Sequence, residues 1–151
     1  MHPKVDPELE KINSPIESGL PASPGGACGQ IVFSATDAET WHKKNKSVIL
    51  IRHETSPEDV QGMYVSQGIV TAKGGMTSHA ALVARGWGKA CIVGCSNLNI
   101  DLKHKTVSIN NVTYKEGDWF TINSTEGLIY DKKLDLVKSN FFRNKYFLKL
   151  I

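Results

Sequence analysis

The residues best suited to chemistry lie in one stretch, in which two glycines come shortly before a histidine. Residues 73–89 read KGGMTSHAALVARGWGK, and His79 opens their run of small apolar residues. An imidazole is a common nucleophile and proton carrier near neutral pH. Gly74 and Gly75 let another molecule come close to the backbone because they carry no side chain. This pattern suits attack on a phosphoryl group, although a single histidine at such a place is more often a surface or cap residue.

The elements that must position His79 are a strand, a turn and a helix. Residues 68–71 are Gly-Ile-Val-Thr, an apolar and β-branched run that predicts a short buried strand. Thr77 or Ser78 supplies a hydroxyl N-cap for a helix that later glycines end. His79 is therefore expected in the first turn of a helix. Free N–H groups and a partial positive charge there attract a phosphate and disfavour the imidazolium cation.

The whole stretch resembles the phosphohistidine signature of the pyruvate, phosphate dikinase family, which belongs to the phosphoenolpyruvate-utilising enzymes. Phosphoenolpyruvate synthase and enzyme I of the sugar phosphotransferase system share the two glycines, the histidine and the Ala-Arg pair. They differ from this chain at Met76 and at residues 86–89, so the dikinase family is the closer resemblance. The resemblance extends from about Gly19 to Tyr130 and includes Arg52, residues 54–59, and Gly62 with Met63.

The resemblance implies a swivelling β/β/α phosphohistidine domain that carries phosphoryl groups between two remote active sites. That family interconverts ATP, phosphate and pyruvate with AMP, pyrophosphate and phosphoenolpyruvate. His79 would be the catalytic residue that forms the phosphohistidine, and Gly74, Gly75, Thr77 and Ser78 would form the phosphate loop. A carrier domain of phosphoenolpyruvate synthase and a non-catalytic swivelling domain that only binds partners stay open as alternatives.

The other parts of such an enzyme are expected outside this chain. The sequence contains no Walker loop and no carboxylate cluster suited to magnesium. ATP and Mg²⁺ would therefore be bound in the full enzyme, by the nucleotide-binding and pyruvate- or phosphoenolpyruvate-binding domains, and the full enzyme would be a homodimer. This piece would not turn over alone. Thr77 matches the position at which plant dikinases are switched off by threonine phosphorylation, and its alternative role is the N-cap.

Two further predictions concern the surroundings of His79. Arg85 follows the histidine by six residues, about 240° around an ideal helix. We expect it to anchor the helix or meet a partner domain rather than contact the phosphate. Residues 56–59, Ser-Pro-Glu-Asp, signal another helix start, with a hydroxyl cap, a proline at the first position and acids in the first turn. Thr55 and Ser56 are accordingly expected to act as caps.

Composition limits the remaining function classes. The chain has 151 residues and a net charge of +3, and its lysines are scattered, which does not favour nucleic-acid binding. No apolar run approaches the roughly 20 residues that span a bilayer, so no membrane contact is expected. Cys28, Cys91 and Cys95 are an odd number without secretory features. They predict free thiols in an intracellular protein, cytoplasmic or organellar (plastid or glycosome), and not a zinc site.

Three segments are expected along the chain, with an α/β fold of mixed sheet layers and short helices. Residues 1–24 are rich in proline and serine, which predicts an extended linker without regular elements. Residues 25–131 would be the phosphohistidine domain, in which strand–helix–strand units precede short hairpins. Residues 132–151 have apolar side chains at roughly helical spacing, which predicts a trailing helix or linker.

Overall fold

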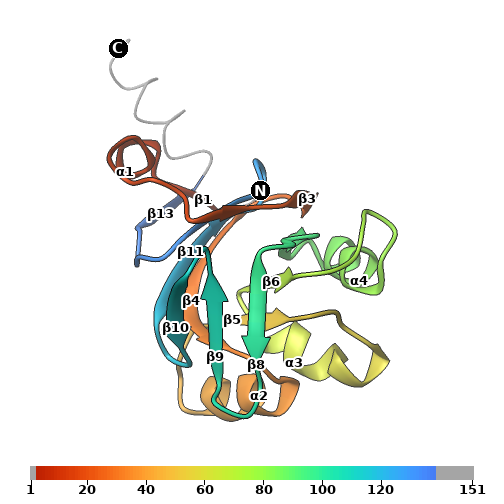
Figure 1. The fold of residues 1–151 in the computed structure, drawn as a ribbon. Coiled ribbons are helices and arrows are strands. Elements are labelled where there is room, and N and C mark those ends of the chain that lie inside the picture. The colour runs from red at the N-terminus through yellow and green to blue at the C-terminus, as the bar shows by residue number, and fades with distance from the viewer. Residues whose placement is uncertain (1–2, 139–151) are drawn as a thin grey trace.

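An eight-stranded mixed sheet organises the chain, whose residues 3–138 are described by the computed structural model (Figure 1). Its four central strands, β4 to β7, are parallel, and antiparallel strands flank them on both sides. Isoleucine and valine recur in these parallel strands because both faces of the sheet are covered. In spatial order the strands are β2 (Glu17–Ser18), β12 (Leu128–Tyr130), β11 (Trp119–Asn123), β4 (Gly26–Val32), β5 (Val48–Arg52), β6 (Gly68–Thr71), β7 (Ala90–Val93) and β3 (Leu20–Ser23).

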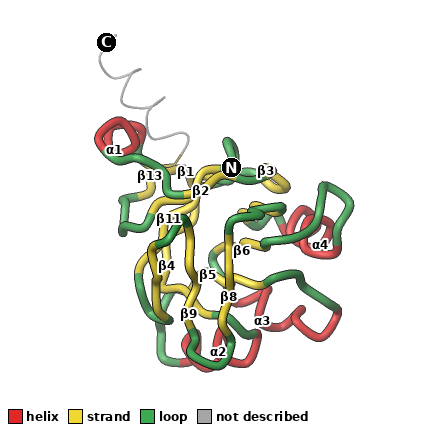
Figure 2. The backbone as a smooth tube through the Cα atoms, in the orientation of Figure 1, coloured by secondary structure: helices red, strands yellow, loops and turns green. Residues whose placement is uncertain are grey.

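Three helices connect the parallel strands and cover one face of the sheet. They are α2 (Ala35–Lys43), α3 (Val60–Val65), which the 3-10 turn η1 (Pro57–Asp59) precedes, and α4 (His79–Trp87). Their buried side chains pack with alternate residues of the central strands, such as Leu50, Ile69 and Val93. Figure 2 shows these helices beside the strands that they connect. The predicted mixed α/β layers are confirmed by this arrangement.

A three-stranded antiparallel sheet covers the other face. It consists of β8 (Leu98–Asp101), β9 (Thr106–Ile109) and β10 (Val112–Lys115). Alternate residues of β8 and β9 enter the same core as Ile31, Ile49 and Phe120 of the large sheet. A turn at Asn110 and Asn111 joins β9 to β10, and both asparagines have positive φ, 50° and 69°. This conformation is the one that two-residue hairpin turns require.

The prediction that prolines keep residues 1–24 free of regular elements is wrong. Strand β1 (Pro3–Val5) and helix α1 (Pro7–Ile12) lie here, and β2 and β3 are the two edge strands of the large sheet. Pro7 occupies the first helical turn, where no N–H partner is needed, and Pro21 lies on an edge strand. Proline is compatible with both positions. Glu10 ties α1 to the sheet by accepting hydrogen bonds from Asn123 and Tyr130.

The described part of residues 132–151 also differs from the predicted trailing helix. Leu134 is buried, and strand β13 (Leu136–Lys138) pairs antiparallel with β1. A small apolar cluster of Val5, Tyr130 and Leu134 joins these two segments to the domain. The remainder of the predicted helix, residues 139–151, lies outside the described residues. Within residues 3–138, no helix is long and apolar enough to cross a membrane.

Candidate functional site

The strand–turn–helix predicted around His79 is present, and His79 is the first residue of α4. Ser78 is the N-cap, and its hydroxyl oxygen accepts from the N–H of Ala81 at 3.5 Å. Of the two predicted caps, therefore, Ser78 has this role, while Thr77 is exposed in the turn. Gly88 ends the helix with φ 66°, the left-handed conformation typical of a glycine C-cap.

A threonine from the connection between β5 and α3 contacts one nitrogen of the histidine ring. The Oγ1 atom of Thr55 lies 2.9 Å from Nδ1 of His79. Thr55 follows β5, and the glycine turn follows β6, so both come from the carboxyl ends of neighbouring parallel strands. Loops at such ends meet at one edge of a sheet and commonly form binding sites. The prediction that Thr55 acts as a cap missed this contact.

The contact with Thr55 occupies one ring nitrogen, where the hydroxyl donates or accepts according to the tautomer of the ring. When Nδ1 carries the proton and donates it to the Thr55 hydroxyl, Nε2 has the free lone pair. Within the described part of the chain, no residue forms a hydrogen bond with Nε2. His79 is partly exposed, so solvent or a second molecule can approach the ring. The arrangement is suited to nucleophilic attack through Nε2.

The two glycines of the turn have different surroundings. Gly74 has φ 111°, and a Cβ atom placed on it would lie 2.9 Å from Cβ of Ser78. It therefore needs to be glycine for the turn itself. Gly75 has no atom within 4 Å of such a Cβ position. The space beside Gly75 and the start of α4 is open to an incoming anion, which the free N–H groups of a helix start favour.

Two basic residues of the motif are used for structure. Arg85 donates from Nη1 to the carbonyl oxygen of Ala22 at 3.2 Å and from Nη2 to that of Met76. It thus ties α4 to β3 and to the turn, in line with the predicted anchoring role. Lys89 donates to the carbonyl oxygens of Tyr64 and Ser66 at 2.8 and 2.5 Å, and burial lowers its pKa. In these hydrogen bonds both cations contact backbone carbonyl groups and not the ring of His79.

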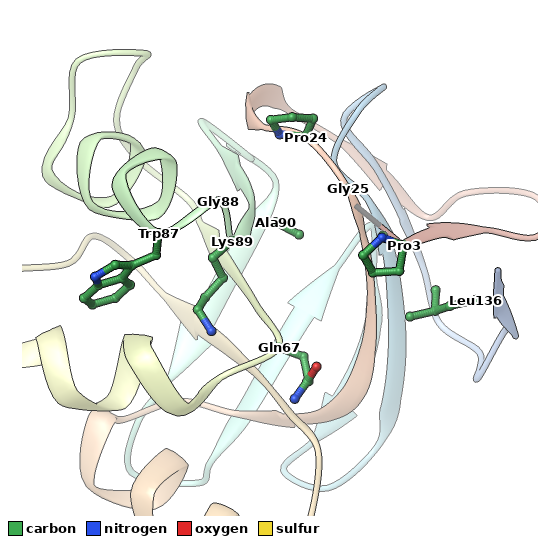
Figure 3. Close-up of a pocket in the computed structure, with 10 residues that line it drawn as sticks. Pro3, Pro24, Gly25, Gln67, Trp87, Gly88, Lys89, Ala90 and Leu136 are labelled. Atoms are coloured by element: carbon green, nitrogen blue, oxygen red, sulfur yellow. The ribbon is translucent and has the colours of Figure 1, made fainter. Parts of the chain in front are cut away.

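A pocket of about 180 Å³ lies at the other end of α4 (Figure 3). Trp87, Gly88 and Lys89 line it from the helix end, and Pro3 and Leu136 line it from β1 and β13. His79 is at the opposite end of the same helix. This pocket therefore does not belong to the site around the histidine.

The three cysteines are free, as the sequence predicts. Burial raises the pKa of Cys91, under α4, and that of Cys95 to about 12. Thiols with such values are protonated and unreactive near neutral pH. Among residues 3–138, no three His, Cys, Asp or Glu side chains gather as metal ligands would.

Comparison with known proteins identifies the class to which this fold and site belong. The family described as "PEP-utilising enzyme, mobile domain" matches residues 44–127, more than half of the chain. The chain therefore belongs to this family of mobile domains.

Individual relatives narrow the resemblance. "Pyruvate, phosphate dikinase 1, chloroplastic" of Arabidopsis thaliana is 54% identical over 130 residues, which are 84% of this chain and 13% of that protein. "Pyruvate, phosphate dikinase 2" of Zea mays is 53% identical over 127 residues, 84% of this chain and 14% of that protein. The resemblance to the dikinase family is thus confirmed, and the chain spans only about one seventh of these relatives.

The solution structure of an Enzyme I protein matches 68% of this chain and 36% of that chain, with 23% sequence identity and a TM-score of 0.39.

Proposed function

We propose that this chain is the phosphoryl-carrier domain of a pyruvate, phosphate dikinase and that His79 forms its phosphohistidine. The observation that carries the proposal is the position of the ring. His79 begins a helix beside a glycine turn, Thr55 occupies Nδ1 at 2.9 Å, and Nε2 is left without a hydrogen bond among the described residues. The 54% identity to a dikinase supports the same function.

In the first transfer, the lone pair of Nε2 attacks the phosphorus of a donor. A nitrogen–phosphorus bond forms, and the bond from phosphorus to the leaving oxygen breaks, so that the oxygen departs with the electron pair. With the ring proton on Nδ1, 2.9 Å from Thr55 Oγ1, the hydroxyl oxygen can accept that hydrogen bond throughout the step. Return transfer reverses the order: an acceptor oxygen attacks phosphorus, and Nε2 regains its lone pair.

The start of α4 would stabilise the phosphorylated ring. The group carries negative charge, and the free N–H groups and partial positive charge of a helix N-terminus interact favourably with it, by roughly 0.3–1 kcal/mol for an exposed group. This contribution alone is far too small for the full barrier. Additional cations must therefore come from the other domains, and no step of the proposal passes through a metal held by this chain.

The full reaction sequence and the partners belong to the proposal as well. His79 would accept a pyrophosphoryl group from ATP, lose its outer phosphoryl group to phosphate and deliver the inner one to pyruvate. ATP, Mg²⁺ and pyruvate would be bound by partner domains of a homodimeric enzyme. A plastid is a location in keeping with relatives named as chloroplastic.

Thr77 is the proposed regulatory position. It is exposed two residues before His79, and Ser78 already caps the helix, so the hydroxyl of Thr77 is accessible for modification. A phosphate there would add a charge of about −1.5 to −2 beside the nucleophile and repel an anionic donor.

Labelling of the intact protein tests the proposal. With labelled phosphoenolpyruvate, or with labelled ATP, we expect a phosphate on His79 that is labile to acid and stable to base. His79→Asn should abolish it, while Ser108→Ala, at a partly exposed position of β9, should not. No label from either donor would contradict the carrier function. AMP formation that does not depend on inorganic phosphate would instead support a phosphoenolpyruvate synthase.

A further inference from the structure

A turn held by one buried carboxylate fixes the backbone beside Thr55. Thr55 lies in the connection between β5 and η1, outside any helix or strand. The N–H of Ser56 donates to Oδ2 of Asp59 at 2.9 Å, and the N–H of Asp59 donates to the carbonyl oxygen of Ser56 at 2.9 Å. These two bonds close the turn directly after Thr55. The position of its hydroxyl group therefore depends on where the Asp59 side chain lies.

Asp59 is itself fixed to the end of the large sheet. Its side chain is 9% exposed, and the same Oδ2 atom lies 3.6 Å from Nε of Arg52. Arg52 is the last residue of β5, and its Nη1 atom donates to the carbonyl oxygen of Phe33 at 3.1 Å. A nearly buried carboxylate is stable only when it keeps such partners. A chain of contacts therefore runs from β5 through Arg52, Asp59 and Ser56 to Thr55.

We propose that Asp59 is a positioning residue for His79. Its carboxylate accepts a hydrogen bond from the N–H of Ser56. This bond places the Thr55 hydroxyl against Nδ1 of His79, and the hydroxyl favours the ring form that is protonated on Nδ1. Asp59 forms no hydrogen bond with the ring or its Nε2 atom. The role of Asp59 in phosphoryl transfer rests on the proposed function. The ratio of the two protonated forms of the ring, however, can be measured in the chain without a phosphoryl donor.

The test is an NMR measurement of the ring nitrogens of His79 in the ¹⁵N-labelled chain, at a pH where the ring is neutral. It gives the ratio of the form protonated on Nδ1 to the form protonated on Nε2. Thr55→Val removes the hydrogen-bond acceptor and should lower the ratio about fivefold, equivalent to ~1 kcal/mol at about 1.4 kcal/mol per factor of ten. Asp59→Ala should lower it by at least twofold. Asp59→Asn should keep it within twofold, because the amide oxygen can still accept from Ser56.

Controls separate positioning from a general loss of stability. Asp6→Ala removes a comparable cap, since Oδ1 of Asp6 accepts from the N–H of Glu8 at 3.0 Å on the distant helix α1, and it should leave the ratio unchanged. The double variant Thr55→Val with Asp59→Ala should match Thr55→Val alone. Should Asp59→Ala not fold, Asp59→Glu keeps the charge for Arg52 but shifts the carboxylate, and it should also lower the ratio.

Two results would overturn the inference. One is a wild-type ratio in the folded Asp59→Ala or Asp59→Glu variant. The other is a loss from Asp59→Ala of the same size with and without Thr55, since Asp59 would then act by another route. Labelling with phosphoenolpyruvate is scored separately, so a chain that shows these ratios but never becomes phosphorylated would refute the proposed function and leave the positioning role intact.

Discussion

The two glycines before His79 should respond differently to the same substitution. Gly74 has φ 111°, and an added Cβ would lie 2.9 Å from Cβ of Ser78, the residue that caps α4. Backbone strain of this kind costs about 1–3 kcal/mol, and the close contact places Gly74→Ala near about 2 kcal/mol. Gly75 has a clear surrounding and no positive φ. Gly75→Ala should therefore change the free energy of unfolding by less than about 0.5 kcal/mol, the usual range for surface substitutions.

Thermal unfolding followed by circular dichroism gives the first measurement. For about 150 residues, each kcal/mol shifts Tm by roughly 2–4 °C, so Gly74→Ala should unfold about 4–8 °C below wild type and Gly75→Ala within about 1–2 °C of it. The second measurement is the rate of labelling of His79 in the intact protein. Gly75→Ala should slow labelling although it leaves stability unchanged, because its methyl group occupies the space through which the phosphoryl group approaches.

The two measurements can refute the reasoning separately. If Gly74→Ala unfolds at the wild-type temperature, the turn does not depend on the backbone conformation described here. If Gly75→Ala is labelled at the wild-type rate, the phosphoryl group does not approach over that side of the turn.

Further predictions follow from packing and burial. Gly62→Ala should lower the free energy of unfolding by at least about 2 kcal/mol in a denaturant titration, because its Cβ would lie 2.4 Å from Cα of Ala35 in the facing helix. Gly86→Ala should instead raise the free energy of unfolding by about 0.5–1 kcal/mol, because no atom lies within 4 Å of the added Cβ. Equal effects of the two substitutions would contradict the packing described. Cys91 and Cys95 have pKa values raised from 9.0 to about 12 by burial, so the folded form retains their protons while the unfolded form releases them above about pH 9. Stability should thus fall as the pH rises from 9 to 12, and urea titrations of the Cys91→Ala, Cys95→Ala double variant should show a smaller decline. In iodoacetamide labelling at pH 8, Cys91 and Cys95 should react only after unfolding, and rapid modification of either one in the native chain would disprove its burial.

Local sequence signals predicted the elements closest to His79. The N-cap, the small residues of α4 and its glycine end lie within a dozen positions, so short-range rules of helix capping are sufficient. The contact between Thr55 and His79 spans 24 positions. It depends on β5 and β6 being neighbours in the sheet, which no local pattern specifies.

The ends of the described chain were predicted less well for a similar reason. Proline is a strong local signal against regular structure, yet at Pro7 and Pro21 the missing N–H group has no partner to lose. Strand β8 was also not predicted, because Asn99 and Asp101 on its exposed face interrupt the apolar pattern. Pairing with β9 determines its structure, and that pairing cannot be read from four residues.

The hydrogen bond between Thr55 and His79 restricts how the domain can work with its partners under the proposed function. Since Nδ1 is occupied, a donor and an acceptor must both meet the ring at Nε2 and from the same side. Two partner sites therefore compete for one surface and exclude each other. The carrier can serve them only in alternation, so its pace is bounded by how quickly one partner releases that surface to the other.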